Sequence, residues 1–148
     1  MANHIRQQIR ERVTTDLTGL TTTGSNVFQS RVYPLQSGEL PGILIYTNSE
    51  ESMPVVQDAN RLLERNLRLS VEAYAEGTAN FDDTIDTICK EVETALASDR
   101  TLNSLAKDCY LTSTDITLEG SGDKPLGYAQ MIFTVEYMTL ERSPDSAQ

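Results

Sequence analysis

The chain has 148 residues, of which 39% are hydrophobic, and its formal net charge is −10. This length suits one domain with a core of its own. The acidic charge disfavours a module that grips DNA, because the phosphates would be repelled. The apolar runs are far shorter than the ~20 residues of a membrane helix, so we expect no membrane association.

The charge distribution bears on contact with DNA, and the cysteine content bears on the cellular compartment. Four arginines and two carboxylates give residues 1–35 a net charge of +2, so the rest of the chain carries −12. Such a surface does not argue against DNA passing nearby, because a conduit through which DNA slides should not hold it. The two cysteines form no disulfide framework, and we expect reduced thiols in a cytoplasmic product.

The first part of the chain predicts one helix and two strands. A helix is expected over Asn3–Leu17, with Asn3 as a candidate N-cap, because apolar residues recur every four positions. Val27–Tyr33 reads as a short strand that Pro34 ends. Ile43–Thr47 is apolar on both faces, which is typical of a central strand. The helical stripe consists of Ile5, Ile9, Val13 and Leu17.

A long polar stretch, Asn48–Arg65, follows and is expected to be a loop between strands. Loops of this length in compact domains are usually functional or disordered. This one contains the apolar pairs Val55-Val56 and Leu62-Leu63, for which the sequence offers no obvious core. Apolar residues flanked by charge suit a subunit contact, and the sequence leaves an assembly role and disorder equally open.

The stretch Asn66–Ala97 predicts a strand followed directly by a helix. In Leu67–Ala73 apolar and polar residues alternate, which is the period of a strand with one buried face. After a turn over Glu76–Asn80, apolar residues recur every three or four positions and predict a helix. The helical stripe consists of Phe81, Ile85, Ile88, Val92 and Leu96.

The rest of the chain predicts mostly sheet. Residues 1–148 are therefore expected to form one α+β domain, with an antiparallel or mixed sheet of about five strands and helices on one face. The remaining predicted elements are a short helix over Thr101–Lys107, a strand over Leu111–Glu119, a hairpin loop over Gly120–Pro125, a strand over Leu126–Leu140 and a frayed polar tail over residues 141–148.

Three acidic residues offer a candidate metal site. Asp82, Asp83 and Asp86 have the DDxxD spacing of enzymes that hold magnesium against a diphosphate, and this spacing can place carboxylates on one helix face. Such enzymes use a second acidic motif, which this sequence lacks. Acids in the first turn of a helix also cap free N–H groups and complement the helix dipole, and we favour that interpretation.

No other set of residues predicts a catalytic, metal-binding or phosphate-binding site. His4 is the only histidine, and a catalytic triad or a zinc site would need further partners that the sequence does not supply. Cys89 and Cys109 are interpreted as core or near-core residues. Gly120-Ser121-Gly122 connects two predicted strands, whereas a phosphate-binding loop leads into a helix. The sequence therefore predicts no catalytic residue, no metal and no cofactor.

Arg6 and Arg10 lie one turn apart on the predicted first helix. They could contact an acidic partner surface, or they could form part of a solvated helix face. The solvated face is the default interpretation of a pair of exposed cations.

The order, length and pattern of these elements resemble the tail terminator proteins of long-tailed bacteriophages, the minor tail protein U type of lambda-like phages. The resemblance covers most of the chain and includes the acidic stretch after the second strand, but it contains no diagnostic motif. The other matching stretches are Ile5–Leu17, Leu40–Thr47, Arg65–Tyr74, the helix that starts near Asp82, and Tyr128–Tyr137.

The resemblance implies a structural virion protein that is not an enzyme. Members of the family form a six-subunit ring on the end of the finished tail tube, where it stops polymerisation and presents a surface to the head. The implied partners are five further copies of the chain, the major tail tube protein and a head-completion or connector protein. Genomic DNA would pass through the lumen without specific binding. The protein would be made in the host cytoplasm and lie at the head-proximal end of the tail.

The resemblance also suggests where subunits meet. A ring of small domains needs head-to-tail contacts, and a long loop is a plausible means of reaching the neighbour. As a hypothesis, Glu50, Glu51, Arg61 and Arg65 contact the next subunit, with Arg6 and Arg10 as further interface candidates.

Three alternatives stay open. A neck, head-completion or tail-completion protein would share much of this plan. A small α+β ligand-binding domain would need a concave apolar pocket with convergent polar groups. An acidic inhibitor that mimics nucleic acid would bind a basic enzyme in a salt-sensitive manner.

Overall fold

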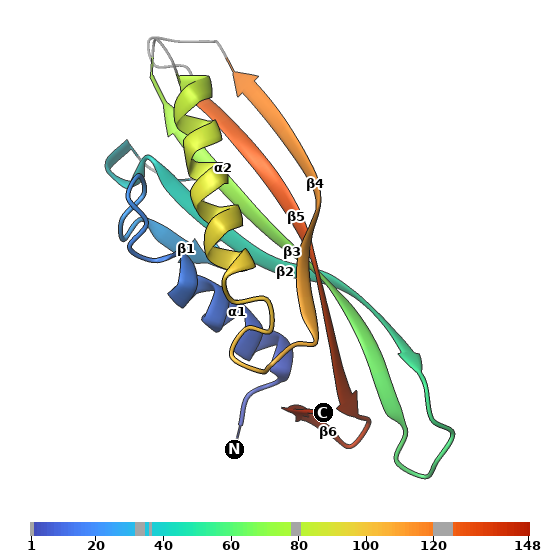
Figure 1. The fold of residues 1–148 in the computed structure, drawn as a ribbon. Helices are drawn as coiled ribbons and strands as arrows, with labels where there is room; N and C mark the ends of the chain where they lie inside the picture. Colours follow the sequence, from blue (N-terminus) through green and yellow to red (C-terminus); the bar gives the residue numbers. More distant parts are fainter. Residues whose placement is uncertain (1, 32–34, 36, 78–80, 120–125) are drawn as a thin grey trace.

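A six-stranded mixed sheet with two helices on one face forms the framework of the computed structural model, which describes residues 2–31, 35, 37–77, 81–119 and 126–148 (Figure 1). The single α+β domain predicted from the sequence is therefore confirmed. The elements in chain order are α1 (Ile5–Leu17), β1 (Val27–Gln29), a 3-10 helix (Ser37–Glu39), β2 (Gly42–Pro54), β3 (Leu62–Glu76), α2 (Phe81–Ala97), β4 (Asp108–Glu119), β5 (Leu126–Leu140) and β6 (Ser143–Ala147).

The sheet has the strand order β1-β2-β3-β5-β4, and β6 pairs with β5. Among the described strand pairs, only β1–β2 is parallel. The centre is β3, whose alternating pattern buries every second side chain on the helix side of the sheet. Opposite it, β5 has the bounds expected from the sequence, and the registers Leu69↔Phe133 and Val71↔Met131 pair core residues directly.

Both helices cover the same face of the sheet (Figure 1). α2 contacts β3, β4 and β5, whereas α1 contacts β1, β2, β6 and α2. The predicted stripe on α1 is buried throughout, as are Ile85, Ile88, Val92 and Leu96 of α2. The predicted N-cap is wrong by one residue: His4 caps α1, and its Nδ1 accepts the backbone N–H of Arg6 at 3.0 Å.

The stretch Asn48–Arg65 is not a loop. β2 continues to Pro54 and β3 begins at Leu62, so only residues 55–61 connect the two strands. The antiparallel register runs from Ser49↔Arg68 to Pro54↔Leu63, after an irregularity that follows Tyr46. These strands project beyond the helices (Figure 1), so much of their surface meets water and apolar alternation is not required. This is why a polar sequence formed a strand that the pattern did not predict.

Two further expectations were wrong. Residues 101–107 form turns instead of a helix, and Leu102, Asn103 and Ser104 have left-handed φ values of 48°, 57° and 68°. The C-terminal stretch does not fray, because β6 pairs with β5 and the Asp145 carbonyl accepts a hydrogen bond from Gln8 Nε2 at 3.3 Å.

Two strands differ from their predicted bounds. β1 stops at Gln29, before Ser30 with its φ of 54°, and residues 32–34 of the predicted strand lie outside the described residues. β4 begins three residues earlier than predicted, at Asp108. The predicted loop Gly120–Pro125 also lies outside the described residues.

Candidate functional site

A cluster of charged side chains lies where the β2–β3 hairpin leaves the helices. The Glu50 carboxylate is paired with Arg6 Nη1 at 2.8 Å and Arg65 Nη1 at 3.1 Å, and it accepts a hydrogen bond from the Tyr137 hydroxyl. Arg65 Nε donates to Thr139 Oγ1 at 2.9 Å. We call these five residues the Glu50 cluster.

The Glu50 cluster is shielded from water and internally satisfied. The side chains of Glu50 and Arg65 are 9% and 11% exposed, and the Arg6 side chain is 37% exposed. Buried charges of opposite sign that share hydrogen bonds avoid the cost of unpaired burial. Burial, with the hydrogen bond to Glu50, raises the pKa of Tyr137 above its usual range. Burial also lowers the pKa of His4, and Arg6 and Arg65 lower it further.

The structure therefore brings Glu50, Arg65 and Arg6 together within one chain. The sequence placed the first two on a loop and Arg6 on a helix, and it missed Tyr137 and Thr139. Polar residues on the otherwise apolar helix side of β3 and β5 are the signal that could have revealed the cluster. A contact of these residues with a neighbouring subunit stays a prediction.

The other three predicted interface residues lie apart from the cluster. Arg61 Nε is 3.7 Å from Glu141 Oε1, and both side chains are exposed. Arg10 donates to Gln29 and to Thr47 at 3.1 and 2.9 Å. Glu51 is exposed beside Glu50 on β2.

The face of the sheet opposite the helices is strongly acidic. Among the side chains that the structure describes, the strand registers place seven carboxylates on this uncovered face, together with Arg68. The alternation of side chains that gives β3 and β5 their apolar helix side puts these acids together. The carboxylates belong to Glu51, Glu64, Glu72, Glu76, Asp108, Asp115 and Glu136.

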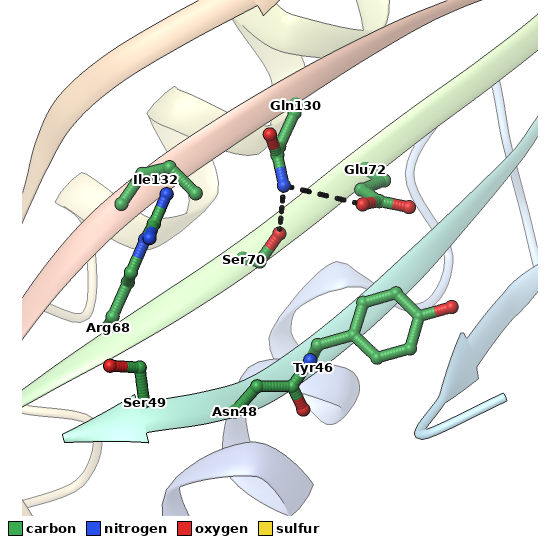
Figure 2. Close-up of a pocket in the computed structure, with 8 residues that line it drawn as sticks. All are labelled: Tyr46, Asn48, Ser49, Arg68, Ser70, Glu72, Gln130 and Ile132. Atoms are coloured by element: carbon green, nitrogen blue, oxygen red, sulfur yellow. Dashed lines mark hydrogen bonds between the residues drawn. The ribbon is translucent and has the colours of Figure 1, made fainter. Parts of the chain in front are cut away.

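A polar pocket of about 330 Å³ opens on this uncovered face (Figure 2). Gln130 Nε2 lies 3.3 Å from Ser70 Oγ and 3.5 Å from Glu72 Oε2, while Tyr74 donates to the other Glu72 oxygen at 2.8 Å. The Tyr74 and Tyr128 rings stack nearby with centroids 5.1 Å apart. Small-molecule sites are mostly apolar and concave, so this pocket does not favour the ligand-binding alternative.

The pocket also lacks the arrangement that nucleophilic catalysis requires. Ser49 and Ser70 lie in it, but no histidine does. Burial raises the pKa of the Cys89 thiol to about 11 and that of Cys109 to about 12, so both stay protonated near neutral pH and are poor nucleophiles.

The described residues offer neither a metal site nor a membrane-spanning helix. Asp82 and Asp83 occupy the first turn of α2, and the side chains of Asp82, Asp83 and Asp86 are all exposed. The described part of the chain contains no group of three or more histidine, cysteine or acidic residues able to hold a metal ion. Neither described helix has the length and apolar character needed to cross a membrane.

Comparison with known proteins gives the family. No curated protein matches the chain. Among solved structures, a chain of the "virion of native gene transfer agent (GTA) particle" is 13% identical over 90% of each chain, with a TM-score of 0.39. The family model described as phage minor tail protein U matches residues 4–137, which include both helices and nearly all of the sheet. The chain therefore belongs to the phage minor tail protein U family and is a structural component of a virion tail.

Proposed function

We propose that this protein forms a hexameric ring at the head-proximal end of the tail tube. The ring ends polymerisation of the major tail tube protein and presents the surface on which the head-completion or connector protein docks. The family match over residues 4–137 is the observation that carries this proposal. The chain would be made in the host cytoplasm and act as a structural component, not as an enzyme.

The uncovered acidic face supports the passage of DNA through such a ring. Of the side chains that the structure describes, seven carboxylates and one arginine lie on this face, so the face repels phosphates at short range. If this face lines the lumen, genomic DNA meets a wall that does not bind it. The helices then lie on the outer side of the ring.

The sheet itself supports head-to-tail assembly. Among the described strands, β4 is one edge of the sheet, and β1 pairs only with Ile43–Ile45 of β2, so most of β2 forms a second edge without a strand partner there. Two different edges on one domain suit a contact that repeats from copy to copy and closes into a ring.

A tube-termination assay tests this proposal. Purified tail tube protein is polymerised with and without this chain, and tube lengths and tube ends are recorded by electron microscopy. We expect capped ends that no longer add tube protein. Binding to isolated head connectors without any binding to tube ends would instead indicate the neck or head-completion alternative.

A further inference from the structure

Two acids share one arginine where the end of α1 meets the connection between α2 and β4, residues 98–107. Arg12 Nε lies 2.8 Å from Asp99 Oδ2 and 3.5 Å from Asp16 Oδ1. The side chains of Asp16 and Asp99 are only 14% and 21% exposed, so water shields neither charge well. One guanidinium balances one carboxylate, and a second carboxylate at such a site is disfavoured by burial and by the first.

The hydrogen bonds indicate that Asp16 is the acid that holds a proton. Asp99 Oδ2 accepts from Arg12 Nε, and Asp99 Oδ1 accepts from the backbone N–H of Asn103 at 3.1 Å. Asp16 Oδ2 is buried and finds no donor among the described residues, so a proton suits its surroundings better than a charge. Burial, with the hydrogen bond that protonated Asp16 makes to Asp99, raises the pKa of Asp16 to about 7. Burial alone would raise the pKa of Asp99, but the hydrogen bonds that it accepts lower it.

The groups on the β4 side do not relieve this imbalance of charge. Asp108, at the start of β4, is a further carboxylate beside Cys109. Burial, with Asp108, Asp99 and Asp16 nearby, raises the pKa of the Cys109 thiol to about 12, so the thiol is neutral. Arg100 and Lys107 belong to the same connection, but neither makes an ion pair with a described residue.

The other elements that pack on α1 use their charged groups elsewhere. β1 contains no titratable side chain. Among the described residues, Arg12 is therefore the cation that favours a charge on Asp16, while burial and Asp99 oppose it. The charged groups of the remaining elements include Glu91 of α2, which accepts hydrogen bonds from Thr22, Glu50 of β2, which pairs with Arg6, and Asp145 of β6, whose backbone carbonyl meets Gln8.

The backbone of the connection depends on Asp99 for support. Leu102, Asn103 and Ser104 are all left-handed, with φ values of 48°, 57° and 68°. This conformation is unfavourable for residues with a Cβ and persists only where the surroundings hold it. Asp99 supplies part of that hold, because its carbonyl accepts the Leu102 N–H at 2.9 Å and its side chain accepts the Asn103 N–H. Through Arg12, the same side chain fastens the connection to α1.

We propose that Asp16, Asp99 and Arg12 form a proton-operated latch that fastens the connection between α2 and β4 to α1. With a proton on Asp16, the three groups carry no net charge together and the latch is closed. When Asp16 loses this proton to solvent, two shielded carboxylates face one arginine, and the connection moves away with Asp99. Leu102, which is fully buried, then leaves the core, and the start of β4 is released. The latch does not depend on the proposed ring.

The direction of the pH response follows from the proton. The closed form binds a proton at Asp16 with a pKa of about 7, whereas the open form has the ordinary carboxyl value of 3.8. The proton therefore stabilises the closed form at low pH, and this stabilisation is lost as the pH rises through 7. Between pH 6 and pH 8 the equilibrium constant for opening should rise about tenfold.

Amide hydrogen exchange of the full chain, followed by NMR, tests the latch. Protection of the Leu102, Asn103 and Ala106 amides, relative to an unstructured peptide at the same pH, should fall about tenfold between pH 6 and pH 8. Low concentrations of urea should hardly change their exchange, because a local opening exposes little surface. Exchange of the most protected amides of β3 and β5 should respond steeply to urea. Equal protection at the two pH values, or the same urea response as the sheet, would overturn the latch.

Two further measurements assign the proton to Asp16. Asp16→Asn keeps a hydrogen-bond donor but cannot ionise, so its protection at pH 8 should equal that at pH 6. The matched control Asp86→Asn, at an exposed position of α2, should keep the tenfold change. In the unmodified chain, which needs no variant to fold, the carboxyl carbon of Asp16 should titrate near pH 7 together with the loss of protection. A tenfold change that persists in Asp16→Asn, or an Asp16 carboxyl that titrates at the ordinary value of 3.8, would overturn the assignment.

Discussion

Glu50 and Arg65 lie on neighbouring strands with 3.1 Å between Glu50 Oε2 and Arg65 Nη1, and their side chains are only 9% and 11% exposed. The same carboxylate holds Arg6 of α1 and the Tyr137 hydroxyl of β5. One buried anion therefore ties a helix and three strands together at the base of the projecting hairpin.

Removal of the Glu50 charge should destabilise the fold. Glu50→Gln keeps the shape but leaves Arg65 buried without its anion, and breaking a buried pair from one side costs about 3 kcal/mol or more. We expect a loss of about 3 kcal/mol in the free energy of unfolding, measured by urea denaturation. The neighbouring Glu51→Gln change is the control, and at its exposed position it should alter that value by no more than about 0.5 kcal/mol. Equal effects of the two changes would contradict the role assigned to Glu50.

Asp16 should make stability depend on pH near neutrality. Burial, with the neighbouring Asp99, raises the pKa of Asp16 to about 7 in the folded chain, against 3.8 for an unperturbed carboxyl. As a carboxylate, its Oδ2 is buried without a hydrogen-bond partner in the described structure. A folded-state pKa above the unfolded value stabilises the fold at low pH, and this stabilisation is lost as the pH rises through 7.

The test compares unfolding free energies of the wild type and Asp16→Asn between pH 5 and pH 8. The wild type should lose stability relative to the variant as the pH rises, because only its side chain must ionise while buried. Asp86→Asn, at an exposed position of α2, should follow the wild-type profile. Parallel profiles for the wild type and Asp16→Asn would contradict this account.

The left-handed turn after α2 offers a stabilising substitution. Ser104 has a φ of 68°, a conformation that costs residues with a Cβ about 1 kcal/mol and glycine nearly nothing. Ser104→Gly should therefore raise the melting temperature by a few degrees, as measured by circular dichroism. Ser98→Gly is the matched control, because Ser98 N–H still bonds to Thr94 O in helical fashion and glycine there should lower stability. A loss of stability in both variants would show that the turn is not strained at Ser104.

Charge on the uncovered face should control the passage of DNA. The variant Glu64→Lys, Asp115→Lys, Glu136→Lys turns three repelling carboxylates of that face into phosphate-binding cations. Phage particles assembled with it should eject DNA more slowly, with the largest delay at low salt. The control Asp82→Lys, Asp83→Lys, Asp86→Lys makes the same charge change on α2 and should leave ejection unchanged. Equal delays would show that the uncovered face does not line the lumen.

The sequence predicted the buried elements of this fold well, because an element with one buried face has apolar residues at regular intervals. The stripe on α1 and the alternation in β3 each follow from one face that must avoid water. The distal half of β2 shows no such regular pattern, since Ser49–Pro54 are polar or exposed on both faces. A strand held mainly by its backbone ladder cannot be recognised from side-chain periodicity.

The candidate interface was predictable in part. The pair Val55-Val56 stood out in the sequence, and it occupies the exposed hairpin tip. Arg65, expected beside it, is instead a buried member of the Glu50 cluster, because its strand turns that side chain to the helix side. The Glu50 cluster depends on how distant segments pack, which no local pattern encodes.

The mass of the assembled protein tests the central claim most directly. Six chains of 16.4 kDa give 98.4 kDa, and we expect a ring of this mass by light scattering and electron microscopy, either free or on the ends of purified tail tubes. A chain that stays monomeric or dimeric in solution at every concentration, and leaves tube ends bare, would contradict the account.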